Sequence, residues 1–412
     1  MPQIHTITAT DSHSQGQLIL QNGWPYQASF EGWKYVPDYV YITTQSALDS
    51  ALADMKSSKY LALDTESSSF YTYLNELCLL QYTTETSHGI IDPLCGLDLS
   101  ALGRLMEDPS IQKIFHAAAS DIVELKRDLG WKFENVFDTF LACKYLGHDG
   151  CSLSALAERY CGVILEKGEQ KSNWKQRPLS QSQLDYAHLD TRYLPRIRDR
   201  IMPELKKLNL EDEYYQEIEF QVATLSDDAP QKDANAYARV NGVGKLSAPE
   251  RGRFKAVFEI REEEAARLNI APFRLVNNQE MIRMARQKPE RTSDLKRFRG
   301  NPRFFADRGQ DLIKSLASAT PIEKSRLPEQ IPFDPGTESL FQSLKGWRSK
   351  IADKRQLESG MILNNRTLKE IARRRPANLD QLRSLQLMTD WKATNYGPQI
   401  LNIIQQAEAQ QQ

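Results

Sequence analysis

The second half of the chain contains two related segments, which are 87 positions apart. REEEAARLNIAPFRLVNNQEMIRMARQKPERTSDLKRF (261–298) aligns without a gap with RSKIADKRQLESGMILNNRTLKEIARRRPANLDQLRSL (348–385). Matching apolar positions could reflect core periodicity alone. However, Asn-Asn occurs at the same place in both copies, and Pro289 matches Pro376, which indicates a true duplication. Two copies are too few for a solenoid, so the sequence predicts two separate small helical domains.

The first half alternates between strand-like and helix-like patterns over residues 38–215. KYLALD, LCLLQYTT, HGIIDP and KIFHA are short apolar runs with strand character. DLSALGRLMED, ASDIVELKRDLG, FDTFLACKYLG and LSALAERYCG show helical spacing, and a long amphipathic stretch follows from Ser180 to about Leu208. This alternation predicts an α/β domain with a central sheet.

Two segments interrupt these patterns. SDDAPQKDANA (226–236) and the proline-rich PIEKSRLPEQIPFDPGTES (321–339) are typical of linkers. The expected layout is therefore an unassigned N-terminal extension at 1–37, an α/β domain at 38–225, and helical domains at 233–320 and 335–412.

Bulk features exclude several classes of protein. No apolar run approaches the roughly 20 residues that span a bilayer, and MPQIHTITATDSHSQG lacks the basic and apolar regions of a signal peptide. The five cysteines are odd in number and form no Cys-x-x-Cys pair. We therefore expect a cytoplasmic protein with no membrane partner, whose thiols are reduced and form neither a zinc site nor a disulfide. The sequence does not indicate an oligomeric state.

The net charge of −1 conceals a division along the chain. Residues 1–240 carry 22 basic against 34 acidic side chains, and residues 241–412 carry 31 against 20. The basic half includes a dense cluster between Arg283 and Arg303, within which Arg297 and Arg299 lie. Attraction between the two halves could explain the division, but the clustering favours contact with the phosphates of a nucleic acid.

The stretch YLALDTESSSF begins as a buried strand and then places Asp64 and Glu66 two residues apart. Both side chains project from one face of the strand, where they repel each other. A divalent metal, a basic side chain or simple solvation of the strand end could relieve this repulsion. This stretch alone favours simple solvation of the strand end.

Two further acidic positions occur in the α/β region. Asp121 lies near the first turn of a helix, where an N-cap is the commoner role. Tyr186 and Asp190 lie four residues apart on one helix face, and Asp190 could pair with a nearby arginine. Taken singly, each position is more typical of a structural residue than of a catalytic one.

Together these positions resemble the three motifs of the DEDDy 3′–5′ exonucleases: Asp-x-Glu at a strand end, Asp at a helix start, and Tyr-x-x-x-Asp. LALDTE, FHAAASD and NWKQRPLS (173–180) are similar to the sequences around those motifs. Over roughly residues 40–410 the chain resembles the ribonuclease D family. The resemblance implies a ribonuclease H-like exonuclease domain with a central mixed sheet, followed by all-α HRDC domains. The duplicated tail would supply two of the latter.

This resemblance implies a metal-dependent exoribonuclease. Two divalent ions, Mg²⁺ or Mn²⁺, would be held by Asp64, Glu66, Asp121 and Asp190. Tyr186 would position the attacking water, because a tyrosine with an ordinary pKa near 10 is protonated at neutral pH. Trp174 and Arg177 would contact substrate by stacking and by phosphate pairing. His116 and His188 are assigned no role, and Asp138 is expected to cap a helix.

The expected activity is removal of single nucleotides from RNA 3′ ends as 5′-monophosphates. The resemblance indicates precursor tRNA and other structured small RNAs with 3′ extensions as substrates. One alternative is a DNA exonuclease of the Werner-like branch, although no helicase P-loop is present, since NGVGKLS lacks the first glycine. The other is a catalytically silent RNA-binding scaffold.

Overall fold

The computed structural model describes residues 39–166, 168–225, 233, 235–323 and 334–409. The N-terminal extension and most of both expected linkers lie outside these ranges. Helix α14 begins at Pro335, so the last five residues expected in the second linker are helical. Within the described ranges, no helix is both long and apolar enough to cross a membrane.

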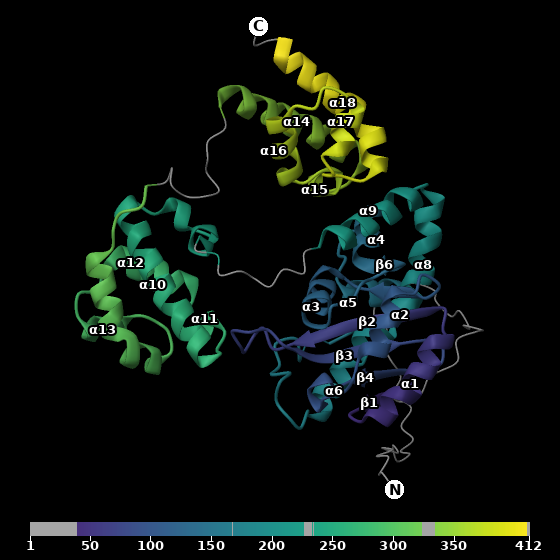
Figure 1. Cartoon of the computed structure of the whole chain (residues 1–412), viewed down its shortest axis with the longest axis horizontal. Coiled ribbons are helices and arrows are strands. Elements are labelled where there is room, and N and C mark those ends of the chain that lie inside the picture. The colour runs from purple at the N-terminus through teal and green to yellow at the C-terminus, as the bar shows by residue number, and fades with distance from the viewer. Residues whose placement is uncertain (1–38, 167, 226–232, 234, 324–333, 410–412) are drawn as a thin grey trace, which may run out of the picture. The chain divides into compact units, whose positions relative to one another are not determined.

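The α/β unit is built on one six-stranded sheet (Figure 1). Its strands are β1 (Val40–Ile42), β2 (Tyr60–Ser67), β3 (Leu77–Thr83), β4 (His88–Ile91), β5 (Gln112–Phe115) and β6 (Val136–Asp138). The order across the sheet is β1-β4-β3-β2-β5-β6. Strand β3 is antiparallel to both of its neighbours, and the other three pairs are parallel. The predicted mixed sheet is thus confirmed.

Helices cover this sheet and share one apolar core with it. They are α1 (Gln45–Ser57), α2 (Ser100–Glu107), α3 (Ala119–Leu129), α4 (Thr139–Tyr145), α5 (Leu153–Cys161), α8 (Leu194–Lys207) and α9 (Glu211–Thr224). FDTFLACKYLG is not helical throughout, because Phe137 and Asp138 end strand β6. Asp138 then caps α4, and its carboxylate accepts from the backbone N–H groups of Phe140 and Leu141.

The long amphipathic stretch from Ser180 to about Leu208 forms three helices. They are α6 (Gln181–Ala187), α7 (Leu189–Arg192) and α8. Pro195 lies in the first turn of α8, where its missing N–H is tolerated, but it cannot continue the hydrogen bonding of α7. The backbone stays helical at His188 and Tyr193, so Tyr186 and Asp190 remain close to one helical turn apart.

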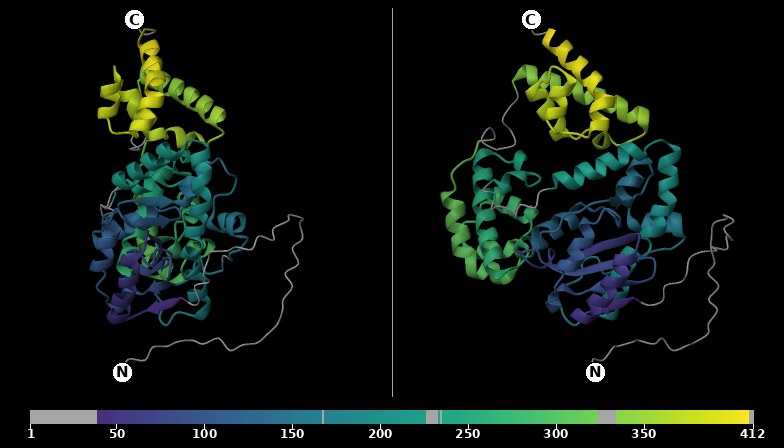
Figure 2. Two further views of the ribbon diagram at one scale, coloured as in Figure 1. Left: turned by 90° about the vertical axis from the view of Figure 1, so that its right-hand side faces the viewer. Right: turned by 45° about the vertical axis from the view of Figure 1, so that its right-hand side comes forward.

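The two helical units repeat one another element by element (Figure 2). The first contains α10 (Ala248–Leu268), α11 (Pro272–Leu275), α12 (Asn278–Gln287), η4 (Thr292–Arg297) and α13 (Pro302–Ser318), preceded by η2 (Ala236–Arg239) and η3 (Val243–Lys245). The second contains α14 (Pro335–Arg355), α15 (Ser359–Ile362), α16 (Asn365–Arg374), α17 (Leu379–Ser384) and α18 (Asp390–Ala409). Each unit has its own apolar core.

Backbone details repeat at the same offset. Asn269 and Gln356 end the first helix of each unit in the left-handed conformation, with φ of 49° and 54°. The buried guanidinium of Arg261 donates to the carbonyl of Val276, as that of Arg348 does to Leu363. Neither feature follows from apolar periodicity, so they support the duplication that the sequence indicated.

The cysteine prediction was wrong for one pair. Cys143 in α4 and Cys151 before α5 form a disulfide, with Cα atoms 5.8 Å apart, which lies within the span of such bonds. The two cysteines are 8 positions apart in the sequence, so no Cys-x-x-Cys spacing signals this bond. Cys78, Cys95 and Cys161 are free thiols.

Candidate active site

Strand β2 carries the first two carboxylates. Its neighbours are β3 on one side and β5 on the other, so it lies in the middle of the sheet. Leu61, Ala62 and Leu63 are fully buried and anchor the strand. Asp64 and Glu66 follow on one face of the strand, and the register with β3 shifts immediately after Glu66. The acids therefore lie where the regular ladder ends.

Helix α7 brings the third carboxylate to the sheet. The hydroxyl groups of Thr191 in α7 and Thr83 in β3 are 2.9 Å apart in a buried hydrogen bond. Asp190 precedes Thr191. One carboxylate oxygen of Asp190 lies close to one oxygen each of Asp64 and Glu66. These three oxygens are all within 4.8 Å of one another.

Asp121 lies in the first turn of α3 and outside this group of three. It is not the N-cap of α3, a position that Ala118 occupies. Its carboxylate instead accepts a hydrogen bond from the hydroxyl of Thr65, which lies between the two acids of β2. Asp138 supports the same region, because it accepts from the N–H groups of Ala117 and Ala118 just before α3.

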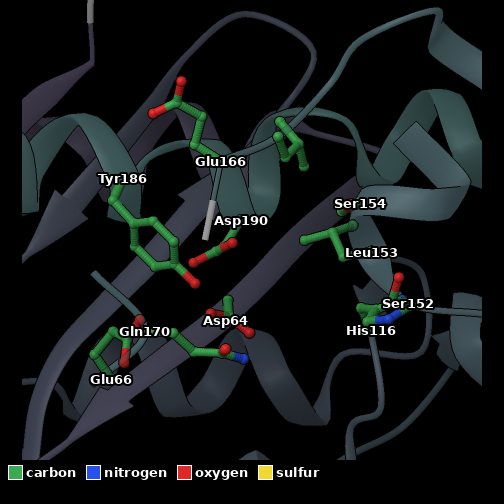
Figure 3. Close-up of a pocket in the computed structure, with 11 residues that line it drawn as sticks. Asp64, Glu66, His116, Ser152, Leu153, Ser154, Glu166, Gln170, Tyr186 and Asp190 are labelled. Atoms are coloured by element: carbon green, nitrogen blue, oxygen red, sulfur yellow. The ribbon is translucent and has the colours of Figure 1, made fainter. Parts of the chain in front are cut away.

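The three converging carboxylates face a cavity of about 340 Å³ (Figure 3). Asp64, Glu66, Tyr186 and Asp190 line it, and Figure 3 shows the hydroxyl end of Tyr186 turned toward the carboxylates. The remaining described lining residues are His116, Ser152, Leu153, Ser154, Leu165, Glu166 and Gln170. None of the described lining residues is a lysine or arginine.

The crowding of carboxylates changes their acidity. Burial, and then the charges of Asp121, Asp190 and Glu66, raise the pKa of Asp64 well above its usual range. Burial, followed by the charge of Asp190, raises the pKa of Glu66 to about 9. Without a cation, the site would therefore hold protons at neutral pH.

A divalent cation fits this donor set. The three converging groups are all carboxylates, and hard oxygen ligands of this kind suit Mg²⁺ and Mn²⁺. A cation would relieve the mutual repulsion that otherwise forces protons onto the acids. Asp64, Glu66 and Asp190 would hold it, with Asp121 close by on α3.

Known proteins share both parts of this architecture. A family model described as 3′-5′ exonuclease matches residues 39–206, and an HRDC domain model matches 250–316 and 337–404. Ribonuclease D of Sphingobium indicum is 33% identical over 302 residues, which cover 72% of this chain and 76% of that protein. The chain belongs to the ribonuclease D family. It is a 3′–5′ exoribonuclease with a metal-dependent exonuclease domain.

Other relatives cover more of the chain. Ribonuclease D of Gluconacetobacter diazotrophicus is 27% identical over 373 residues, which cover 89% of this chain and 92% of the relative. The crystal structure of Escherichia coli RNase D superimposes with a TM-score of 0.64 at 21% identity, covering 90% of this chain and 99% of that one. Its fold, a ribonuclease H-like domain followed by HRDC domains, is therefore the fold of this chain.

Two of the predicted substrate contacts are already engaged within the exonuclease domain. Trp174 is only 2% exposed and packs beside Tyr186, with ring centroids 6.1 Å apart, so it has no free face for a base. Arg177 donates to both carboxylate oxygens of the buried Asp92, at 2.6 and 2.7 Å, and also to backbone carbonyls. We therefore reassign both residues from substrate contact to support of the segment before α6.

The predicted basic cluster is an exposed surface of the first HRDC domain. Its exposed members lie on α12, η4 and the start of α13, and we call them the α12–η4 basic surface: Arg286, Lys288, Arg291, Lys296, Arg297, Arg299 and Arg303. Arg283 is half-buried, since its guanidinium packs over the Phe298 ring. In the second copy, Arg373 and Arg374 both pair with Glu370.

Sequence reasoning missed several residues near the site. Glu124, one turn after Asp121, is 7% exposed and accepts a hydrogen bond from the Asn75 side chain. Its helical spacing from Asp121 could have suggested that it shares the same face. Ser152, Ser154, Glu166 and Gln170 reach the cavity from segments with no motif, so only the tertiary fold identifies them.

Proposed function

We propose that this member of the ribonuclease D family releases nucleotides one at a time as 5′-monophosphates, using two divalent ions, Mg²⁺ or Mn²⁺. The observation that carries the proposal is the convergence of Asp64, Glu66 and Asp190. Bound metal would supply charge stabilisation at the phosphate and a more acidic water. Asp121, held by Thr65, would support the second ion from the α3 side.

Tyr186 would orient the attacking water. Burial and the nearby Asp190 carboxylate raise the pKa of Tyr186 above its ordinary value, so its hydroxyl keeps its proton at neutral pH. A protonated hydroxyl can donate or accept a hydrogen bond, but it is a poor base. Packing against Trp174 would hold the ring in place.

The proposed substrates are RNAs with 3′ extensions, including precursor tRNA and other structured small RNAs. The α12–η4 basic surface would grip the RNA backbone, because exposed arginine and lysine side chains neutralise phosphates without reading sequence. Within this surface, we assign Arg297 and Arg299 to contacts with RNA phosphates. The ribonuclease D name of the relatives supports RNA over DNA.

The test compares a 3′-extended tRNA precursor, an unstructured RNA and the DNA counterpart, each with a free or a blocked 3′ end. Mass spectrometry of the released nucleotide identifies the product. We expect 5′-monophosphates from both RNAs, only from free 3′ ends, and faster release from the precursor. Faster shortening of DNA would instead favour the Werner-like alternative, and release of 3′-phosphates would contradict the proposed chemistry.

A further inference from the structure

The protonation of His116 is fixed by its neighbours. Nδ1 of His116 lies 2.9 Å from Oγ1 of Thr139, and this oxygen lies 3.0 Å from the carbonyl oxygen of Phe115. A carbonyl oxygen only accepts, so the single hydroxyl proton of Thr139 is donated to it. Oγ1 must then accept from His116, and the ring proton is therefore on Nδ1.

The other ring nitrogen is consequently a hydrogen-bond acceptor. Burial lowers the pKa of His116 to about 4, so the ring is neutral at pH 7. The ring of Phe140 packs edge-on against it, with centroids 5.8 Å apart. A fixed acceptor repels the non-bridging oxygens of a phosphate, which only accept. It pairs instead with a donor, and a hydroxyl group is the donor common to every ribonucleotide.

His116 lies on the side of the site toward which the leaving 3′ oxygen of the scissile phosphate would move. His116 lines the same cavity as Asp64. In Figure 3, Tyr186 and Glu66 lie on one side of Asp64 and His116 lies on the other. If Tyr186 orients the attacking water, in-line displacement sends the leaving 3′ oxygen away from Tyr186 and toward His116. In RNA the hydroxyl next to that oxygen is the vicinal 2′-OH, and DNA lacks it.

We propose that Nε2 of His116 accepts a hydrogen bond from the 2′-OH of the nucleotide whose 3′ oxygen leaves. His116 thereby makes the site select RNA over DNA. The inference rests on the proposed function, since the role of Tyr186 defines the two sides of the phosphate. It assigns His116 to specificity and gives it no part in the proton transfers of hydrolysis.

The test measures the first cleavage event, under single-turnover conditions, on four RNA oligomers that differ at one sugar. They are all-ribose, 2′-deoxy at the penultimate nucleotide, 2′-fluoro at the penultimate nucleotide, and 2′-deoxy at the terminal nucleotide. For the wild-type protein we expect both penultimate changes to slow cleavage about tenfold, the worth of one hydrogen bond. Fluorine cannot donate, so it should act like hydrogen, and the terminal change should have little effect.

Two variants separate recognition from structural support. His116→Ala should cleave all-ribose RNA about tenfold more slowly and should no longer distinguish the penultimate 2′-deoxy substrate. Thr139→Ser keeps the hydroxyl that fixes the ring proton, so it should keep the discrimination. Nitrogen-15 NMR of the histidine rings in the free protein gives a readout apart from activity, with the proton expected on Nδ1 of His116.

Several results would overturn the inference. One is a wild-type cleavage rate that is the same with and without the penultimate 2′-OH, and another is a change in rate that depends on the terminal sugar or on the base. The others are a ring proton on Nε2 of His116, and equal slowing of ribose and deoxy substrates by His116→Ala. The substrate comparisons need only wild-type protein, so they still decide if a variant fails to fold. A wild-type protein that shortens no RNA would instead refute the proposed function, which distinguishes the two failures.

Discussion

The hydroxyl groups of Thr83 and Thr191 meet in a buried hydrogen bond of 2.9 Å, which ties strand β3 to helix α7. Asp190 is the residue before Thr191, and Asp64 lies on the strand paired with β3. This bond therefore ties the helix that carries Asp190 to the strand that pairs with β2, and β2 carries Asp64 and Glu66.

Replacing Thr191 by valine should weaken both the fold and the site. The change removes the bond and leaves the buried Thr83 hydroxyl without its partner, which costs about 1–3 kcal/mol. Differential scanning calorimetry should show the exonuclease domain melting a few degrees lower, and kcat should fall because Asp190 is less well placed. Thr191→Ser keeps the hydroxyl and is the matched control. Wild-type stability and kcat in Thr191→Val would show that the bond has no positioning role.

Replacing Tyr186 by phenylalanine should slow the chemical step about 10- to 100-fold, as expected when a reacting water is no longer oriented. The ring still packs on Trp174, so the RNA affinity should change little. Single-turnover rates and equilibrium binding measured on one RNA separate these quantities. A loss of affinity with an unchanged rate would instead make Tyr186 a binding residue.

Local patterns predicted much of this molecule. Strands β2 to β5 were visible as apolar runs, and the pairs Asp64–Glu66 and Tyr186–Asp190 are recognisable because each lies within a few residues. Strand β1 has only three residues, which is too few to show a pattern. The end of α7 at Tyr193 depends on the downstream Pro195 rather than on a change in hydrophobic spacing.

Long-range packing accounts for what the sequence could not predict. Arg177 was expected to contact the substrate. Its actual partner, the buried Asp92, lies 85 positions away in the sequence, so no local pattern reveals this pairing. Trp174 was expected to stack on a base. It is instead buried against Cys78, Leu79 and Ile90 of the sheet, and these contacts cannot be read from the local sequence. The role that we propose for His116 rests on Thr139, 23 positions away.

The metal-free protein should lose stability as the pH rises. The folded pKa of Glu66, about 9, exceeds its usual value near 4.3. Between these values the folded state binds a proton that the unfolded state has released, so the free energy of unfolding falls with increasing pH. Melting temperatures in EDTA should therefore decrease from pH 6 to pH 9.

Mg²⁺ should reverse this trend, because a cation stabilises the ionised carboxylates. Its effect on the melting temperature should be larger at pH 8.5 than at pH 6. Glu66→Gln cannot ionise at this position, so it should make the pH dependence in EDTA shallower, while the raised pKa of Asp64 still contributes. An EDTA profile that is flat or rises with pH in the wild-type protein would contradict the description of the site as crowded, protonated acids.

The α12–η4 basic surface should govern the salt dependence of RNA binding. Arg297→Ala/Arg299→Ala removes two exposed charges and should weaken binding uniformly across RNA sequences. The slope of log K against log salt should fall by about 1 to 2. Lys314→Ala, an exposed lysine farther along α13, is the matched control. If the double variant and the control give the same slope, the surface does not contact RNA.

The central claim is that the carboxylates around Asp64 form a metal-dependent exoribonuclease site. The most direct measurement is a time course on one 5′-labelled RNA with a free 3′ end, using wild-type protein and Asp64→Asn, each in Mg²⁺ and in EDTA. We predict a ladder that shortens from the 3′ end only for wild-type protein in Mg²⁺, while Asp64→Asn still binds the RNA. Shortening by Asp64→Asn at a near-normal rate, or by wild-type protein in EDTA, would contradict the account.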